Sequence, residues 1–161
     1  MKETMVMRSS LGNIKLVAED EKLISLYFTE DNFSLEISSV FLLEVRRQLK
    51  SYLAGDLRKF DFSFESIGTG FQKKVWEKVG EIPYGRTCSY EAIANQLESR
   101  NGARAVGAAN GDNPLLIVVP CHRVISKSGA LTGYAGGLWR KVKLLQLEMR
   151  DLPGNQYCLG F

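Results

Sequence analysis

The sequence predicts an α/β N-terminal domain over residues 1–68, built from a small antiparallel sheet plus one helix, and a mostly α C-terminal domain with a (winged) helix-turn-helix over residues 69–161. Three observations support this prediction. Short alternating apolar runs, which are typical of strands, fill the first third of the chain. Apolar residues at helical spacing follow in the remainder. Between the two parts, Gly68-Thr69-Gly70 has the composition of a hinge.

The sheet is predicted from three apolar or alternating runs, at residues 5–7, 14–17 and 23–28. Turn-forming residues separate these runs, first Gly12-Asn13 and then Glu19-Asp20-Glu21. A further half-buried strand is expected where phenylalanines alternate with polar residues, at Phe60, Phe62 and Phe64.

The helix of the first domain is predicted from about Ser39 to Leu53. Its apolar residues recur every four positions, at Phe41, Val45, Leu49 and Leu53. Ser38 or Ser39 can cap its beginning, and Gly55 can end it.

The second domain is predicted to begin with a helix whose apolar face carries Phe71, Val75, Trp76 and Val79. After a turn at residues 82–85, Ser89 can cap a helix that runs through Leu97. Residues 99–102 break this helix, and residues 103–110 can form the next one. Two short helices joined by a glycine-containing turn indicate a helix-turn-helix.

The last third is predicted to contain one buried strand and one helix. The strand runs from Leu115 to Val119 and ends at Pro120, which cannot donate a ladder hydrogen bond. The helix carries Leu138, Val142, Leu145 and Glu148 on one side, and Pro153-Gly154 stops it.

Composition and charge are those of a globular protein with a basic second half. Apolar residues make up 45% and charged residues 24% of the chain. No apolar run approaches the ~20 residues that a membrane-spanning helix needs, and no signal-like segment opens the chain, so we expect a cytoplasmic protein without membrane contact. Residues 1–70 carry a net charge of −2 and residues 71–150 one of +6. A basic half indicates an anionic partner such as phosphate, although charge alone favours a solvated face with no partner.

The chain has three cysteines, Cys88, Cys121 and Cys158, and one histidine, His122. An odd number of widely spaced cysteines is a poor disulfide framework, so free thiols are expected in a reducing compartment. With a single histidine and no CxxC or HExxH spacing, we expect no metal site and no cofactor.

Cys121 is the strongest candidate for chemistry. It follows the predicted strand end at Pro120, where a side chain comes to lie at a rim that can receive a ligand. His122 and Arg123 follow it, and nearby cations lower a thiol pKa. The alternative, a small buried apolar residue, weighs equally, because free cysteines are among the most buried residues.

His122 and Glu148 are the candidates to assist this thiol. Sequence neighbours on a strand point to opposite faces, so a pair formed by Cys121 and His122 needs either a turn or an intervening water. Glu148, on the last predicted helix, can orient His122, although an exposed helical glutamate is the more common case.

The helix at residues 103–110 carries little bulk, because most of its residues are Ala or Gly. Such a surface can approach the DNA minor groove closely, with Arg104 as the one long side chain available for insertion. Close helix–helix packing through small residues explains the composition equally well.

The order of several motifs resembles the O6-alkylguanine-DNA alkyltransferases, also called methylated-DNA–protein-cysteine methyltransferases. The active-site signature of that family resembles Pro120-Cys121-His122-Arg123-Val124. Other blocks resemble the family in the same order: Phe71-Gln72, Val75-Trp76, 82–87, Ser89-Tyr90, 104–107, Asn113-Pro114, 133–137, Leu144-Leu145 and Glu148. The resemblance covers residues 70–148, whereas the first 68 residues resemble the family only in length and layout.

This resemblance implies single-turnover repair of DNA, in which Cys121 takes the alkyl group from O6 of a flipped guanine, and from O4 of thymine in some cases. His122 would act as base through a water, held by Glu148, and Lys141 would help the electrostatics of the reaction. Tyr90 would crowd the target phosphate and protonate the departing guanine. Arg104 would replace the extruded base in the stack.

The remaining implied roles concern DNA contacts, the pocket and assembly. Ala103, Ser99 and Lys127 would contact DNA, while Asn113 would tie the helix-turn-helix to the active-site strand. The backbone near Val124 and Tyr134 would line the guanine pocket. The expected partner is double-stranded DNA containing O6-alkylguanine, bound by a monomer that can cluster on DNA. Two departures stand out: Ala135 occupies a position where some relatives have serine, and no Cys or His precedes Cys88 to bind the zinc of other relatives.

Three other classes of protein compete with this interpretation. Non-catalytic relatives that bind alkylated guanine replace the acceptor cysteine, usually by tryptophan, whereas this chain has Cys121. A cysteine hydrolase or thiol redox enzyme needs an oxyanion hole or a resolving cysteine, for which the sequence gives no sign. A DNA-binding regulator leaves the Pro-Cys-His-Arg segment unexplained and needs base-reading side chains where this chain has Ala and Gly.

Overall fold

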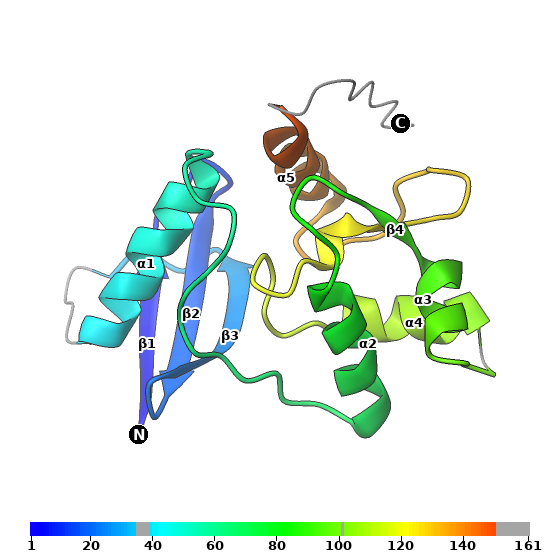
Figure 1. Cartoon of the computed structure of the whole chain (residues 1–161). Helices are drawn as coiled ribbons and strands as arrows, with labels where there is room; N and C mark the ends of the chain where they lie inside the picture. Colours follow the sequence, from blue (N-terminus) through cyan, green and yellow to red (C-terminus); the bar gives the residue numbers. More distant parts are fainter. Residues whose placement is uncertain (35–38, 101, 151–161) are drawn as a thin grey trace. The chain divides into compact units, whose positions relative to one another are not determined.

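The computed structural model describes residues 1–34, 39–100 and 102–150 (Figure 1). The chain forms two compact units. The first contains Met1–Ile67 together with Pro114–Val118, and the second contains Gly68–Asn113 together with the described residues from Val119 on. Among the described residues, no helix is long and apolar enough to span a membrane.

The first unit is a three-stranded antiparallel sheet covered on one face by a helix (Figure 1). Its strands β1 (Lys2–Met7), β2 (Asn13–Glu19) and β3 (Lys22–Thr29) form the predicted antiparallel sheet and pair in sequence order. Asp20 and Glu21 connect β2 to β3, and both have positive φ, which a tight two-residue hairpin of type I′ requires. Alternate strand residues face inward, so Ile14, Leu16 and Leu26 are fully buried.

Helix α1 (Val40–Leu53) supplies the other half of this core, as the four-residue spacing predicts. Ser39 caps it by accepting a hydrogen bond from the Leu42 amide at 3.2 Å. The alternative cap, Ser38, lies outside the described residues. Leu42, Val45 and Leu49 are buried, which places the apolar face of α1 in the core.

The strand predicted at residues 60–64 is wrong. Only Phe64 makes a β-bridge, with Leu23. The Asp61 amide donates to Gln48 Oε1 on α1 at 2.7 Å, so a side chain takes the hydrogen bond that a ladder would use. The rings of Phe60 and Phe62 pack against each other with centroids 5.4 Å apart.

The second unit is mostly helical, as predicted. It contains α2 (Gly70–Gly80), β4 (Cys88–Ser89), α3 (Tyr90–Gln96), α4 (Gly102–Gly111), a short 3-10 helix (Cys121–Arg123), β5 (Val124–Ile125) and α5 (Leu138–Met149). Thr69 and Gln72 cap α2 reciprocally, and Ser89 caps α3 as expected. Helices α3 and α4 pack against each other as a helix-turn-helix pair, and α2 supports α4 through a 2.8 Å hydrogen bond from Trp76 Nε1 to the Ala109 carbonyl (Figure 1). The predicted helix stop at Pro153-Gly154 lies outside the described residues.

The strand predicted from Leu115 to Val119 is also wrong. Leu115 forms a single bridge with Leu26, after which the chain turns. Ile117 has a φ of 71°, and the Val118 amide donates to the Leu116 carbonyl at 2.8 Å, which closes a tight turn. Leu115, Leu116 and Ile117 are buried, and burial alone does not distinguish such a turn from a strand.

Candidate active site

A sharp turn places Cys121 at the start of the short 3-10 helix. The Cys121 amide donates to the Val119 carbonyl at 2.7 Å, and Pro120 precedes the helix as its cap. The side chain is only 2% exposed. It nevertheless lines a small cavity of about 110 Å³, here called the Cys121 hollow, whose other lining residues are Tyr90, Gly107, Asn110, Gly111, Gly133, Tyr134 and Ala135. The two alternatives for Cys121, a buried apolar residue and a thiol placed to receive a ligand, therefore each hold in part. The residue is buried, and it also lines a cavity.

His122 points into a buried charge network rather than toward a strand face. Its Nε2 lies 2.7 Å from Glu148 Oε2, and both side chains are buried. Burial lowers the pKa of His122, and the Glu148 carboxylate only partly offsets this effect. The imidazole is therefore neutral near pH 7 and able to accept a proton.

Arg123, whose role the sequence left open, holds the same carboxylate. Its Nε and Nη2 donate to the two oxygens of Glu148 at 2.7 and 3.0 Å, and its Nη1 donates to the Ile82 carbonyl at 2.7 Å. Burial alone would raise the pKa of Glu148, but His122 and Arg123 together hold it below its usual range. Arg123 thus anchors Glu148 to the turn that begins at Ile82.

The expected lowering of the Cys121 pKa is contradicted. Burial raises the pKa of this thiol to about 11, although a hydrogen bond with the Asn113 side chain and the charge of Lys141 act in the opposite direction. The two neighbours in sequence do not act as free cations beside the thiol, because His122 is neutral and Arg123 binds Glu148. Cys121 is therefore a neutral thiol at pH 7 in this state of the protein.

Lys141 is fully buried on α5 and binds backbone carbonyls. Its Nζ donates to Val124 at 2.7 Å, to Thr132 at 3.1 Å and to Gly133 at 3.3 Å. Burial lowers its pKa to about 8, and only the ionised form of Cys121 would oppose this shift. Lys141 therefore joins β5 to the loop that lines the Cys121 hollow and places a positive charge near the thiol.

Two asparagines from the end of α4 and the residues just after it bind the Cys121 turn. Asn113 Nδ2 donates to the Val119 carbonyl at 2.8 Å, which fits the tie expected of this residue. Asn110 Nδ2 donates to the Cys121 carbonyl at 3.2 Å. Sequence reasoning missed Asn110, and its only signal was a lone amide at the end of a helix of small residues.

The predicted DNA-contact residues separate into two groups. Tyr90, Ala103 and Arg104 line one open groove of about 440 Å³ together with Glu91, Gly107, Ser126, Thr132 and Gly133. Ser99 is half-buried and Lys127 is exposed, and neither lines this groove. Arg104 is exposed, so it is free to reach a partner.

The ring of Tyr90, the first residue of α3, packs close to α4 at Gly107. A side-chain carbon added at Gly107 would lie 3.8 Å from the Tyr90 ring. The Tyr90 hydroxyl lies 3.4 Å from the Thr132 carbonyl, so this ring spans from α4 to the loop before Tyr134. The small residues of α4 thus serve close packing here, while other positions of the helix line the open groove.

The two residues predicted for the substrate pocket differ in position. Tyr134 lines the Cys121 hollow, and its hydroxyl is inaccessible and has no hydrogen-bond partner among the described residues. Val124 is buried beneath the surface and pairs with Cys88 between β4 and β5. Its carbonyl accepts a hydrogen bond from Lys141 Nζ.

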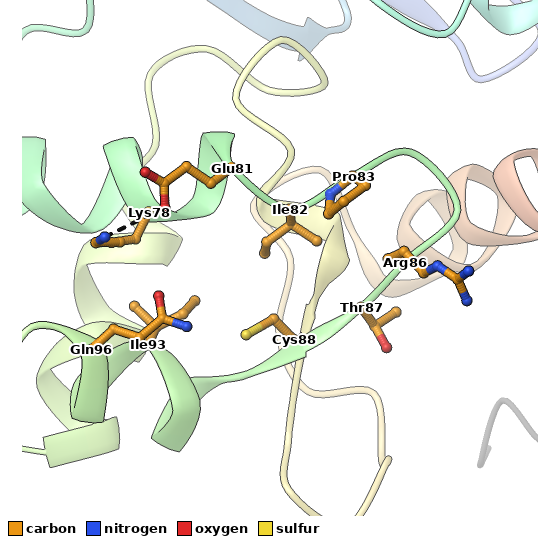
Figure 2. A pocket seen from close by; sticks show the side chains of 9 residues that line it. All are labelled: Lys78, Glu81, Ile82, Pro83, Arg86, Thr87, Cys88, Ile93 and Gln96. Atoms are coloured by element: carbon orange, nitrogen blue, oxygen red, sulfur yellow. Dashed lines mark ion pairs between the residues drawn. The ribbon is translucent and has the colours of Figure 1, made fainter.

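Cys88 lies at a different hollow from Cys121. Figure 2 shows its sulfur pointing into a cavity of about 310 Å³, here called the Cys88 hollow, between α2, α3 and β4. Lys78 and Glu81 form an ion pair at 3.4 Å on its border. Cys158 lies outside the described residues.

The second unit combines a helix-turn-helix pair, which is typical of DNA-binding proteins, with a buried cysteine next to a histidine–glutamate–arginine network. These features indicate the class of DNA-binding proteins that use a cysteine for chemistry. Comparisons with known proteins agree. Residues 70–150 match the model of the 6-O-methylguanine DNA methyltransferase, DNA binding domain. A methylated-DNA–protein-cysteine methyltransferase of Mycolicibacterium paratuberculosis is 44% identical, over 96% of this chain and 97% of that protein.

Solved structures extend this similarity to the fold. The O6-methylguanine methyltransferase of Mycobacterium tuberculosis superposes with a TM-score of 0.85 at 40% identity, over 96% of this chain and 97% of that chain. The OGT of the same organism in complex with DNA gives a TM-score of 0.84 at 42% identity, over 94% of this chain and 95% of that chain. The chain therefore belongs to the methylated-DNA–protein-cysteine methyltransferases, a family of DNA-repair alkyltransferases.

Proposed function

We propose that this protein repairs DNA by moving an alkyl group from O6 of guanine to Sγ of Cys121, once per molecule. The observation that carries the proposal is a buried thiol that lines a hollow and adjoins the His122–Glu148 pair. A thiolate is a strong nucleophile for saturated carbon. The thioether product has no route back to a thiol in this site, so each chain acts once.

The proton of Cys121 must leave as the reaction proceeds, because its pKa of about 11 keeps the resting thiol neutral. We assign its acceptance to His122 through a water, with Glu148 holding the imidazole. The sulfur–carbon bond then forms as the carbon–O6 bond breaks, and the departing guanine takes a proton from the Tyr90 hydroxyl. The positive charge of Lys141 favours the thiolate that develops.

DNA must present its base outside the stack, because the buried Cys121 cannot reach the O6-alkyl carbon of a guanine that stays in the duplex. The open groove with Ala103 and Arg104 supports minor-groove contact, with Arg104 filling the space of the extruded base. Ser99 and Lys127 are assigned to the DNA backbone, and Tyr134 and the backbone near Val124 to the guanine. Asn113 positions the Cys121 turn for this encounter.

We further propose that the domain comprising residues 69–161 carries the activity, without a metal or cofactor, and that the protein binds DNA as a monomer that can cluster along it. A cytoplasmic location fits both its DNA substrate and its free thiols at Cys88 and Cys121.

Intact-protein mass spectrometry tests the proposal. The wild-type chain is incubated with duplex DNA carrying one O6-methylguanine, beside a Cys121→Ala variant. The expected result is a gain of one methylene per wild-type chain, saturating at one, and no gain for the variant. Tight lesion binding without any mass gain would instead indicate a damage sensor, and gain on the variant would assign the acceptor to another residue.

A further inference from the structure

The exposed side of helix α5 carries an aromatic and a cationic side chain that have no part in the site described above. Trp139 and Lys143 lie one helical turn apart and are both exposed, and Gln146 continues the same face in the next turn. The opposite face of α5 is buried through residues such as Val142 and Leu145. The exposed face is here called the Trp139 surface. A single exposed tryptophan needs no partner, so its neighbours decide whether it marks an interface.

Arg140 restrains the side chain of Trp139. Its guanidinium carbon lies 4.5 Å from the centroid of the Trp139 ring, and its Nη1 donates to the Gly136 carbonyl at 2.8 Å. The same cation therefore stacks on the indole and is anchored to the loop that precedes α5. Because the indole is already ordered, it loses little side-chain entropy when it packs against a partner.

The charges around Trp139 suit an anionic partner. From residue 113 to residue 147 the sequence contains no Asp or Glu, whereas it contains five Lys or Arg. Two of these, Arg123 and Lys141, are buried and bound within the protein. The other three, Lys127, Arg140 and Lys143, are at least partly exposed. A stretch with surface cations and no carboxylate attracts a polyanion such as DNA.

The Trp139 surface is continuous in sequence with the groove to which DNA contact is assigned. Thr132 and Gly133 line that groove, and Ala135 lines the Cys121 hollow. Four residues later the same loop has entered α5 at Trp139. Since a chain spans at most ~3.5 Å per residue, the Cα atoms of Ala135 and Trp139 lie within ~14 Å of each other. A DNA strand covers such a distance in about four nucleotides.

Resting on the proposed repair function, we propose that the Trp139 surface is a second DNA contact, in which Trp139 packs against the sugar–phosphate backbone and Lys143 binds a phosphate. DNA is then held at the groove beside α4 and again at α5, a few nucleotides from the extruded base. Contacts to the backbone carry no sequence information, which suits a protein that meets lesions in any sequence. The competing partner is the first unit of a second copy, because residues 1–70 carry a net charge of −2.

Binding of an undamaged duplex at several salt concentrations tests this contact without any transfer step. Anisotropy of labelled DNA gives the affinity of each variant. Lys143→Gln should reduce the slope of log affinity against log salt by about 0.9, the value for one phosphate contact. Trp139→Ala should weaken binding about fivefold and leave this slope unchanged, because it removes an aromatic contact and no charge. Both side chains are exposed, so neither variant should impair folding.

Lys22→Gln is the matched control. It removes an exposed lysine of the first unit that follows Glu21 in the β2–β3 hairpin. A lysine beside acidic residues is a poor phosphate ligand, so this variant should keep the wild-type affinity and salt slope.

Trp139 also supplies its own spectroscopic probe. The other tryptophan of the chain, Trp76, is 3% exposed and donates to the Ala109 carbonyl, whereas Trp139 is 53% exposed. Saturation with duplex DNA should therefore change the tryptophan emission of the wild type. Trp139→Phe should lose most of this change while it still binds DNA.

Wild-type affinity in Trp139→Ala together with a wild-type slope in Lys143→Gln would overturn the inference and leave the proposed function intact. Unchanged tryptophan emission of the wild type at saturation would overturn it as well. Dimers of the wild type that form without DNA in sedimentation velocity, and that Trp139→Ala abolishes, would assign this surface to a second copy instead. Failure of the wild type to bind any duplex would refute the proposed function itself.

Discussion

The two described cysteines of the second unit lie at hollows of opposite character. Cys88 is half-buried at the larger Cys88 hollow, bordered by the ion pair of Lys78 with Glu81, whose side chains are 32% and 58% exposed. Cys121 lines the smaller hollow and is backed by a buried carboxylate bound to a histidine and an arginine. Burial raises the pKa of both thiols. Among the residues that the structure describes at the Cys88 hollow, the only ion pair is the exposed Lys78–Glu81 pair, so the buried charge network rather than exposure singles out Cys121 as the candidate nucleophile.

The largest expected effect comes from neutralising the carboxylate behind Cys121. Glu148→Gln leaves Arg123 buried without its counter-charge, so the free energy of unfolding should fall by about 3 kcal/mol. Urea denaturation followed by circular dichroism measures it. The matched variant at the Cys88 hollow, Glu81→Gln, breaks an exposed pair and should cost about 0.5 kcal/mol or less. Similar losses in the two variants would contradict the contrast drawn between the hollows.

A smaller effect should appear in the pH dependence of stability, where His122 is the only histidine of the chain. Its folded pKa is lowered by burial, so below its unfolded value of about 6.5 the unfolded chain binds a proton that the folded chain does not. Stability should therefore fall from pH 7 toward pH 5, with a slope that approaches ~1.4 kcal/mol per pH unit.

The difference between wild type and His122→Gln isolates this contribution from the carboxylates that also titrate in acid. Denaturant midpoints at several pH values would give the two slopes. A wild-type slope no steeper than that of the variant would mean that the folded imidazole is already charged, and it would remove the neutral base from the proposed mechanism.

The smallest expected effect concerns the wall of the Cys121 hollow. In Gly107→Ala, the new methyl group meets the Tyr90 ring at 3.8 Å, an ordinary contact. Because alanine favours a helix more than glycine does, the free energy of unfolding should rise by up to about 1 kcal/mol. Thermal unfolding measures the gain, and a clear loss would show that α4 and Tyr90 are packed more tightly than this distance implies.

Local patterns were sufficient to predict most of the fold. The alternation in β2, the four-residue spacing in α1 and the capping serine of α3 each specify their element within a few residues of chain. The two strands that were wrong share a cause. At residues 60–64 and 115–119, apolar side chains do not belong to a continuous ladder, and distant residues accept or donate the backbone hydrogen bonds: Gln48 and Leu23 in one case and Leu26 in the other.

The site was predictable as a set of residues but not as a set of interactions. The order of motifs around Cys121 indicated His122, Glu148 and Lys141, which the structure brings together from the 3-10 helix and α5. The sequence did not reveal that Arg123 binds the same carboxylate as His122, nor that burial outweighs charge at the thiol. Both depend on desolvation, which has no signature in the order of residues.

The short segment at residues 114–118 has a consequence for the newborn chain. It binds the outer edge of β3, where the Leu26 amide donates to the Pro114 carbonyl at 2.9 Å and the Leu26 carbonyl accepts from the Leu116 amide at 3.1 Å. On the ribosome, β3 is complete long before this segment emerges. Until then the strand offers unpaired backbone groups to any other extended chain, so synthesis passes through an interval in which the N-terminal sheet is open to aggregation.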